Sequence, residues 1–232
     1  FLTRDQGKIS VIAKNAKQSV RRFSGCLDLF AASCIQCAYP KKNKDGLIVL
    51  AQGSLENGFA NIRYDVLKTA YACYWIELLT LWLEEGRPQE DLFDLLYRAL
   101  GYLDGSALQT EVVSLLFQIR FMSISGFAPN IGTCDSCGSE LDTISGTHLW
   151  FDFKEGRIIC PSCTPTGAAP NRAGAGMQVS KGTLKQLSWM NTVDTDRADR
   201  IRFSSRAIVK ERFYWNPLYR SISAGPLRVL VF

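Results

Sequence analysis

The chain has 232 residues, and its composition of 47% hydrophobic and 21% charged residues excludes a wholly disordered protein. No apolar run reaches the roughly 18 residues that a membrane-spanning helix requires, and the first residues lack the basic-then-apolar pattern of a secretory signal. The net charge of +5 lies in the first 44 residues, which hold nine Lys or Arg and two acidic residues. We therefore expect a cytoplasmic protein with no membrane partner, whose amino-terminal segment either binds a polyanion or presents a solubilising surface.

The first 60 residues have the pattern of short β-strands. The sequence predicts a turn over 4–7, strands over 8–13 and 47–55, and a β-like run over 23–39. Several strands in so short a segment, without helical periodicity, indicate a small antiparallel barrel or sheet.

A basic stretch over 14–22 joins two of these predicted strands. Cations on a loop beside a barrel face can follow a phosphate backbone, and a neighbouring aromatic ring can stack on a base. An isolated basic run is usually only a solvated loop, but above a barrel of the oligonucleotide-binding type the nucleic-acid interpretation is favoured. The predicted DNA-binding residues are Lys8, Lys14, Lys17, Arg21, Arg22 and Phe23.

Helical periodicity begins near residue 63. The sequence predicts a helix over 63–85 that is apolar nearly all round and therefore buried. A second helix is expected to begin at Pro88, and a third at a capping box formed by Ser106 and Gln109. Three consecutive helices with short connections indicate an antiparallel bundle, which we assign to residues 61–128.

Two further helices are predicted near the carboxyl end. One is short and covers 183–190, and the other begins at about residue 205. Because they are too short to bury a core alone, we expect residues 180–232 to pack back on the bundle. Residues 164–178, rich in Pro, Gly and Ala, are predicted to form a mobile loop.

Four of the eight cysteines form two C-x-x-C pairs with 22 residues between them: Cys134, Cys137, Cys160 and Cys163. Each pair can make a tight knuckle, and two knuckles complete a tetrahedral set of sulfur ligands that suits Zn²⁺. Gly138 is expected to help the first knuckle turn by accepting a positive φ. Since four protein ligands leave no open position, we predict one structural zinc ion per chain in a ribbon over 129–179. Two redox dithiols or unmetallated thiols are the alternatives.

The remaining cysteines are predicted to be buried thiols: Cys26, Cys34, Cys37 and Cys73. Cys34 and Cys37 also form a C-x-x-C pair, but a strand would direct them to opposite faces. The only histidine, His148, is expected to cap the ribbon and not to act as a base. With no phosphate-binding loop, nucleophile elbow or paired-carboxylate motif, the sequence favours a binding protein over an enzyme.

Several segments in a fixed order resemble the bacterial recombination mediator family RecO. The resemblance is carried by residues 1–17 and 23–25, the helix over 63–85, the next helix start, Gly126-Phe127-Ala128-Pro129 and the four-cysteine set. The chain differs from the family at Asn15, where Gly is usual, and Asn tolerates the left-handed backbone that this turn needs. The chain also begins with Phe1, and the first barrel strand is expected to be missing, so we predict an amino-terminally truncated sequence.

The resemblance implies an α+β fold, in which an OB-type antiparallel β-barrel over 1–60 precedes an α-helical bundle with an inserted four-cysteine zinc ribbon. It implies a non-enzymatic recombination mediator in DNA repair that binds single- and double-stranded DNA, anneals complementary strands and assists RecA loading with RecR. The implied partners also include the carboxy-terminal tail of single-stranded-DNA-binding protein, with RecA an indirect partner. The implied location is bacterial, cytoplasmic and associated with the nucleoid.

Two other functional classes stay open on the sequence alone. One is an enzyme that acts on nucleic acid through an unrecognised active site. The other is a protein adapter that does not bind DNA, in which the positive charge serves only solubility.

Overall fold

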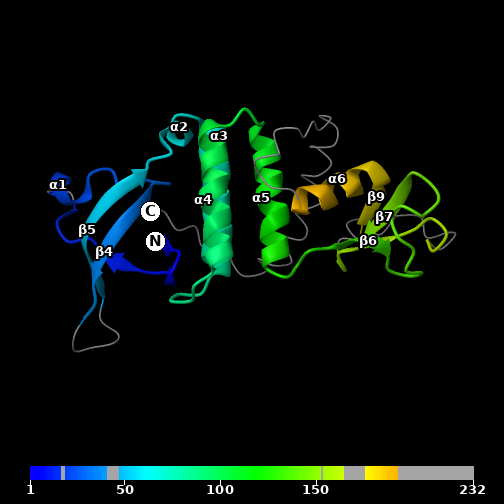
Figure 1. Ribbon diagram of the computed structural model, residues 1–232, viewed down its shortest axis with the longest axis horizontal. Coiled ribbons are helices and arrows are strands. Elements are labelled where there is room, and N and C mark those ends of the chain that lie inside the picture. Colours follow the sequence, from blue (N-terminus) through cyan, green and yellow to red (C-terminus); the bar gives the residue numbers. More distant parts are fainter. Residues whose placement is uncertain (17–18, 41–46, 153, 165–175, 193–232) are drawn as a thin grey trace. The chain divides into compact units, whose positions relative to one another are not determined.

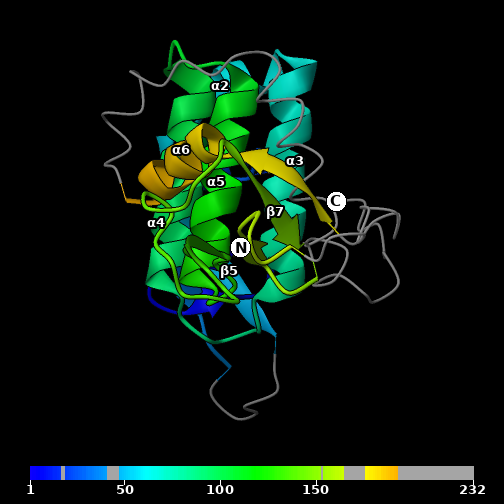
Figure 2. The ribbon, with the colours of Figure 1, turned by 90° about the vertical axis from the view of Figure 1, so that its right-hand side faces the viewer.

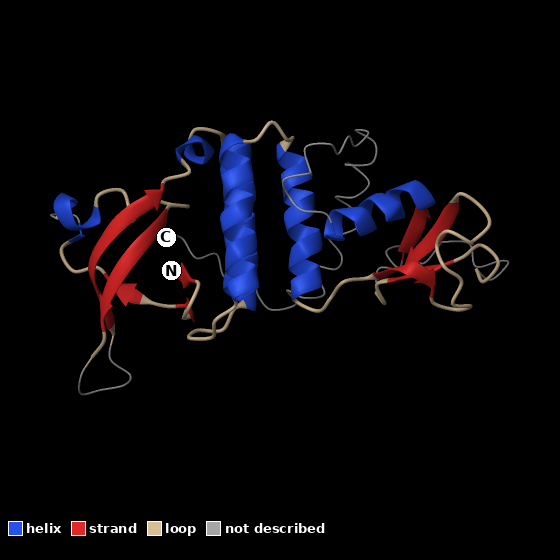
Figure 3. Cartoon of the chain, in the orientation of Figure 1, coloured by secondary structure: helices blue, strands red, loops and turns tan. Residues whose placement is uncertain are grey.

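The structure is a computed structural model of the whole chain, and it describes residues 1–16, 19–40, 47–152, 154–164 and 176–192 (Figure 1). These residues form an α+β protein whose strands belong to three separate sheets (Figure 3). The chain divides into two compact units, residues 1–117 and 118–232. The helix predicted from about residue 205 and most of the predicted loop over 164–178 lie outside the described residues.

The amino terminus forms a small hairpin, in which β1 (Leu2–Thr3) pairs antiparallel with β2 (Gly7–Lys8). The predicted turn over 4–7 is therefore confirmed. Residue 7 has a φ of +69°, and a Cβ there would clash with the carbonyl oxygen of Arg87. Only glycine satisfies both the turn and this close approach. The hairpin also contacts the residue before Arg87, because the Gly86 N–H donates a hydrogen bond of 2.9 Å to the Lys8 carbonyl.

The second sheet contains β3 (Val11–Ile12), β4 (Ala32–Ala38) and β5 (Ile48–Asn57) in the order β3-β5-β4. β5 pairs antiparallel with β4 and parallel with β3. The strand predicted over 47–55 is confirmed, but the run over 23–39 becomes a strand only at Ala32, because helix α1 (Val20–Phe23) and turns precede it. The predicted antiparallel OB-type barrel is not confirmed, since the described strands β3, β4 and β5 form a three-stranded sheet of mixed direction.

The sheet covers a small hydrophobic core. Phe23, Cys26 and Leu50 are buried at its centre, and five partly buried side chains pack against them: Val11, Ala13, Ala16, Ile35 and Cys37. The alternation of buried and exposed residues along β4 places Ile35 and Cys37 on the core face.

The helices follow as α2 (Ala60–Arg63), α3 (Val66–Trp82), α4 (Glu90–Gly105) and α5 (Thr110–Ile124). The Asp65 side chain caps α3 by accepting hydrogen bonds from two backbone N–H groups of its first turn. α3 and α4 lie side by side (Figure 2). The buried Trp75 ring stacks on Phe117 at 4.8 Å between centroids, and its Nε1 donates to Ser114 Oγ at 3.3 Å. Three consecutive helices are therefore confirmed.

Two details of the helix prediction were wrong. α3 is not buried all round, because Val66 and Leu81 are 88% and 54% exposed. α5 begins at Thr110 and not directly after Ser106, whose hydroxyl instead accepts a hydrogen bond from the Leu108 N–H within the preceding turn.

The second unit contains a four-stranded sheet and a helix. Its strands are β6 (Asn130–Cys134), β7 (His148–Asp152), β8 (Arg157–Ile159) and β9 (Gly176–Ser180), in the order β6-β8-β7-β9. Helix α6 (Lys181–Thr192) follows β9 and includes the helix predicted over 183–190. Three residues of α6 are buried: Leu184, Leu187 and Met190. Among the helices that the structure describes, none combines the length and the apolar character needed to cross a bilayer.

Candidate metal centre and basic segment

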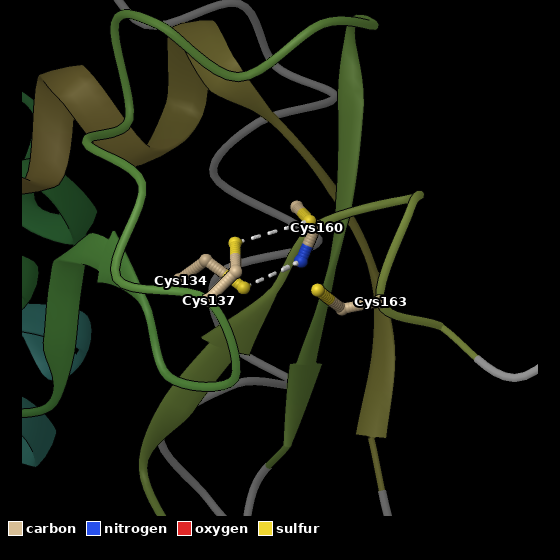
Figure 4. A group of neighbouring side chains, drawn as sticks. All are labelled: Cys134, Cys137, Cys160 and Cys163. Carbon is tan, nitrogen blue, oxygen red and sulfur yellow. Dashed lines mark hydrogen bonds between the residues drawn. The ribbon is translucent and has the colours of Figure 1, made fainter.

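The pairing of β6 with β8 brings the two cysteine knuckles together. β6 ends at Cys134, β8 ends one residue before Cys160, and the two strands run parallel with Cys134 opposite Ile158. Both knuckles therefore begin at the same edge of the sheet. Figure 4 shows the four cysteine side chains converging from these two segments. Every pair of their sulfur atoms lies within 4.8 Å.

The sulfur positions fit a tetrahedral metal site. Zn–S bonds of about 2.3 Å place the sulfurs of a tetrahedron about 3.8 Å apart, and the Sγ atoms of Cys137 and Cys160 are 3.9 Å apart. Gly138 has the expected positive φ of 72°, and its N–H closes the first knuckle on the Cys134 carbonyl at 2.8 Å. Soft sulfur donors in this arrangement can hold a metal ion of the Zn²⁺ type, so the four predicted ligands form one candidate metal site.

Backbone N–H groups stabilise a thiolate at Cys134. Burial raises the pKa of this thiol, but hydrogen bonds from the N–H groups of Cys160, Cys137 and Ser136 outweigh burial, and the pKa is lowered overall. The N–H of Cys160 lies 3.3 Å from Cys134 Sγ. This contact also links the two knuckles directly (Figure 4).

The other two shifted thiols move in opposite directions. The Ser139 hydroxyl, 3.2 Å from Cys137 Sγ, and the Ser139 backbone N–H lower the pKa of Cys137 to about 6, with help from Cys134 and Cys163. The pKa of Cys163 is raised to about 12, first by hydrogen bonding with Cys160 and then with Cys137. At neutral pH the metal-free cluster thus holds a thiolate at Cys137 and a thiol at Cys163. The sequence analysis did not predict that Ser139 lowers the pKa of Cys137. The one feature of the sequence that could have indicated this role is a hydroxyl residue placed two residues after a predicted ligand.

The remaining cysteines and His148 lie outside this cluster. Cys26 is buried as predicted, but the prediction of buried thiols was wrong for Cys34 and Cys73, which are exposed. β4 turns Cys34 to its open face and Cys37 toward the core, so these two do lie on opposite faces. His148 is exposed at the start of β7, and its Nδ1 is hydrogen-bonded to the Thr147 hydroxyl at 2.9 Å.

Two of the predicted DNA-binding residues have structural roles. The Lys8 ammonium donates to the carbonyl of Thr80 at 2.9 Å, in the last turn of α3, where a cation is favoured by the helix dipole. The Phe23 ring is 5% exposed and belongs to the core of the second sheet, so base stacking by this ring is a prediction that we correct. No local pattern indicates either contact, because both depend on residues distant in the chain.

The other described cations of the basic stretch are exposed. Arg21 and Arg22 lie in α1, and the Arg22 guanidinium donates to Ser19 Oγ at 2.8 Å and to the Lys14 carbonyl at 3.2 Å. It also lies over the buried Phe23 ring, 5.1 Å from the centroid. Arg22 therefore holds the two ends of the stretch together while its charge stays on the surface.

Lys14, Arg21 and Arg22 are exposed cations with no acidic partner among the described residues. Within the described parts of the chain, no carboxylate lies at ion-pair distance from any of these three side chains, whereas Arg4, Arg63 and Arg87 each have at least one. We call residues 14–22 the basic segment. Asn15 within it has a φ of 57°, the left-handed conformation expected from the sequence, and Lys17 lies outside the described residues.

These features define an α+β protein that combines a basic segment beside a small mixed sheet with a four-cysteine module that can hold a metal ion. Comparison with known proteins gives the family. Residues 63–210 match the family described as "Recombination protein O C terminal".

Curated relatives extend the match over most of the chain. "DNA repair protein RecO" of Desulfatibacillum aliphaticivorans is 39% identical over 212 residues, which are 91% of this chain and 80% of that protein. The proteins of the same name from Desulfosudis oleivorans and Syntrophus aciditrophicus are 34% and 31% identical, over 89% of this chain and 78% and 76% of their own lengths. The chain belongs to the RecO family, which confirms the resemblance found in the sequence.

Proposed function

We propose that this chain is a DNA repair recombination mediator that binds single- and double-stranded DNA through the basic segment. The observation that carries the proposal is the set of exposed cations without a carboxylate partner among the described residues, at Lys14, Arg21 and Arg22, in a chain of this family. Cations that are not neutralised by neighbouring acids can displace the counterions condensed on a phosphate backbone. Lys17, in the same segment, is included in the proposed interface.

Annealing of complementary strands follows from the same chemistry and requires no catalytic residue. Two single strands repel each other through their phosphates, and a cationic surface that screens this repulsion lets base pairing proceed. The proposed activity is therefore non-enzymatic. The proposed protein partners are RecR and the carboxy-terminal tail of single-stranded-DNA-binding protein, which would bring the chain to coated DNA and assist RecA loading in the bacterial cytoplasm, at the nucleoid.

We also propose that the second sheet is part of an OB-type barrel. β3 and β5 are parallel neighbours although β4 lies between them in the sequence, a crossover that a simple meander lacks and that Greek-key barrels contain. The four-part division into 1–60, 61–128, 129–179 and 180–232 belongs to the same proposal. So does the identity of the metal as one structural Zn²⁺ held by the four cysteines.

The test is the salt dependence of single-stranded DNA binding. Each phosphate contact contributes a slope of about −0.7 to log K against log[salt], so the triple variant Lys14→Ala, Arg21→Ala, Arg22→Ala is expected to flatten the slope by about 2. Fluorescence anisotropy with a labelled oligonucleotide over a salt series measures this slope. Arg87→Ala is the matched control, because this exposed arginine is already paired with Glu84 at 2.7 Å.

An unchanged slope in the triple variant would place the DNA interface elsewhere. Absence of DNA binding by the unmodified chain at low salt would favour the protein adapter. Cleavage or modification of the strand by the purified, metal-replete chain would favour an enzyme.

A further inference from the structure

The two cysteine knuckles are linked by contacts that need no metal. The Asp135 N–H, inside the first knuckle, donates to the Ile158 carbonyl of β8 at 3.0 Å. The N–H of Cys160, at the start of the second knuckle, points at Cys134 Sγ. A third link is an ion pair between the Asp135 carboxylate and the Arg157 guanidinium, with 2.6 Å between Oδ2 and Nη1.

The ion pair lies where the backbone ladder is weakest. β6 and β8 are paired at Asn130 with Arg157 and then at Cys134 with Ile158, so four steps along β6 correspond to one step along β8. Such an irregularity removes regular ladder hydrogen bonds between the two strands. The relative position of the knuckles therefore depends on the few links at the Cys134 end, of which the Asp135–Arg157 pair is the only one made between two charged side chains in the described residues.

The Arg157 guanidinium is paired on one edge and buried on the other. Its Nη1 is bonded to Asp135, while its Nε is buried and has no hydrogen-bond partner in the described part of the chain. The inner edge of the guanidinium is thus turned into the protein, although the side chain as a whole is 39% exposed. A charged group in this position has less freedom than an ordinary surface arginine.

We propose that Asp135 and Arg157 are positioning residues for the metal site, which hold the first knuckle against the second in the metal-binding geometry before the ion arrives. This inference rests on the proposed four-cysteine zinc site. An ion that meets preorganised ligands does not have to order them, so the pair strengthens binding and slows metal release. Neither residue is a ligand, and both act through the knuckles that carry the sulfurs.

The experiment uses the full chain with Co²⁺ and Zn²⁺ as probes. Sulfur-to-cobalt charge-transfer absorption reports an intact tetrahedral site, chelator competition gives the affinity, and a chromogenic chelator gives the rate of zinc release. Asp135→Asn and Arg157→Gln are each expected to lower zinc affinity about tenfold, as loss of an outer hydrogen bond does. The double variant is expected to lose no more than the single variants, because one interaction is removed in all three. Arg157→Lys, which keeps the charge, is expected to recover most of the affinity.

Asp142→Asn is the matched control. Asp142, five residues after Cys137, pairs with Lys185 of α6 in the same unit and not with a residue of either knuckle, and both partners are more exposed than Asp135 and Arg157. An exposed pair of this kind contributes little, so its loss is expected to change zinc affinity by less than about twofold.

Three results would overturn the positioning role. The first is unchanged zinc affinity and release in Asp135→Asn and Arg157→Gln with a normal cobalt spectrum. The second is additive losses in the double variant, and the third is loss of the cobalt spectrum in only one single variant, since both remove the same pair. Absence of a cobalt spectrum in the unmodified chain is a separate outcome, which would overturn the zinc site together with the positioning role.

Discussion

At the scale of the residue, neighbouring cations have different roles. Lys8 and Lys14 are both lysines near the amino end, yet Lys8 binds the last turn of α3 through the Thr80 carbonyl and Lys14 is exposed without an acidic partner in the described residues. Charge and spacing predicted both as DNA contacts, because the sequence pattern does not reveal which cation meets a distant helix end. Phe23 shows the same effect, since an aromatic residue beside arginines has the same pattern whether its ring is buried or stacked on a base.

Substitution of Lys8 therefore tests a structural role. Lys8→Met keeps the aliphatic stem but removes a charged hydrogen bond and a cation at a helix carboxyl end, so the free energy of unfolding is expected to fall by about 1–2 kcal/mol. Urea denaturation measures the loss, with Lys14→Met as the control that leaves stability unchanged. The Lys8→Met variant is expected to have the same salt slope of DNA binding as the unmodified chain. A flatter slope together with normal stability would show that Lys8 contacts DNA.

The thiols of the metal site define a pH dependence at the same scale. Metal binds thiolates, so protons compete with it and zinc affinity falls as the pH falls. Because the pKa of Cys163 is raised to about 12 in the metal-free cluster, at least one proton is released on binding from pH 6 to pH 9. Below pH 6 the Cys137 thiolate, whose pKa is about 6, is also protonated. Metal binding then releases one more proton, so zinc affinity falls more steeply with falling pH.

Zinc affinity measured by chelator competition from pH 5 to pH 9 checks this dependence. The slope of log K against pH is expected to be at least one above pH 6 and greater below it. A flat profile over the whole range would contradict the assigned protonation of Cys137 and Cys163. The Asp142→Asn variant serves as a control, because its substitution lies outside the sulfur cluster.

At the scale of the element, local patterns predicted more than long-range ones. The two C-x-x-C pairs identified the sulfur cluster because each knuckle is local and tetrahedral coordination needs two of them. The helices α3 to α5 were predicted from their periodicity, but periodicity does not show which face meets a partner, so the burial of Val66 and Leu81 was overestimated. The capping box at Ser106 failed because its hydroxyl serves a turn that precedes the helix. The parallel pairing of β3 with β5 joins strands far apart in the chain, and no local signal encodes it.

At the scale of the whole molecule, the order of motifs along the chain was more informative than any single motif. It indicated the RecO family, and the relatives confirm that assignment over 91% of the chain. The positive charge of the first 44 residues indicated a polyanion partner. Which of these cations are exposed and unpaired among the described residues could be seen only in the structure. The basic segment and the metal module belong to different compact units, residues 1–117 and 118–232.

This division predicts that loss of metal leaves the DNA contacts of the basic segment intact. Cys160→Ser removes one of four ligands and is expected to abolish zinc binding, reducing the metal content from one ion per chain to none. The salt slope of single-stranded DNA binding is expected to match that of the unmodified chain, because Lys14, Arg21 and Arg22 lie in the other unit. Metal analysis and the anisotropy series measure the two effects on the same protein. A flattened slope in the zinc-free variant would show that the metal module supplies phosphate contacts of its own.

The parallel pairing of β6 with β8 also sets an order of events during synthesis. The first knuckle is complete at Cys137, but its partner strand β8 begins 20 residues later, at Arg157, and the last sulfur, Cys163, follows 26 residues after Cys137. At roughly 5–20 residues per second, the nascent chain carries an unmatched thiol pair for about 1–5 s. Each knuckle can close its own backbone hydrogen bond as soon as its residues are made, but a four-sulfur site can form only after Cys163 has left the ribosome.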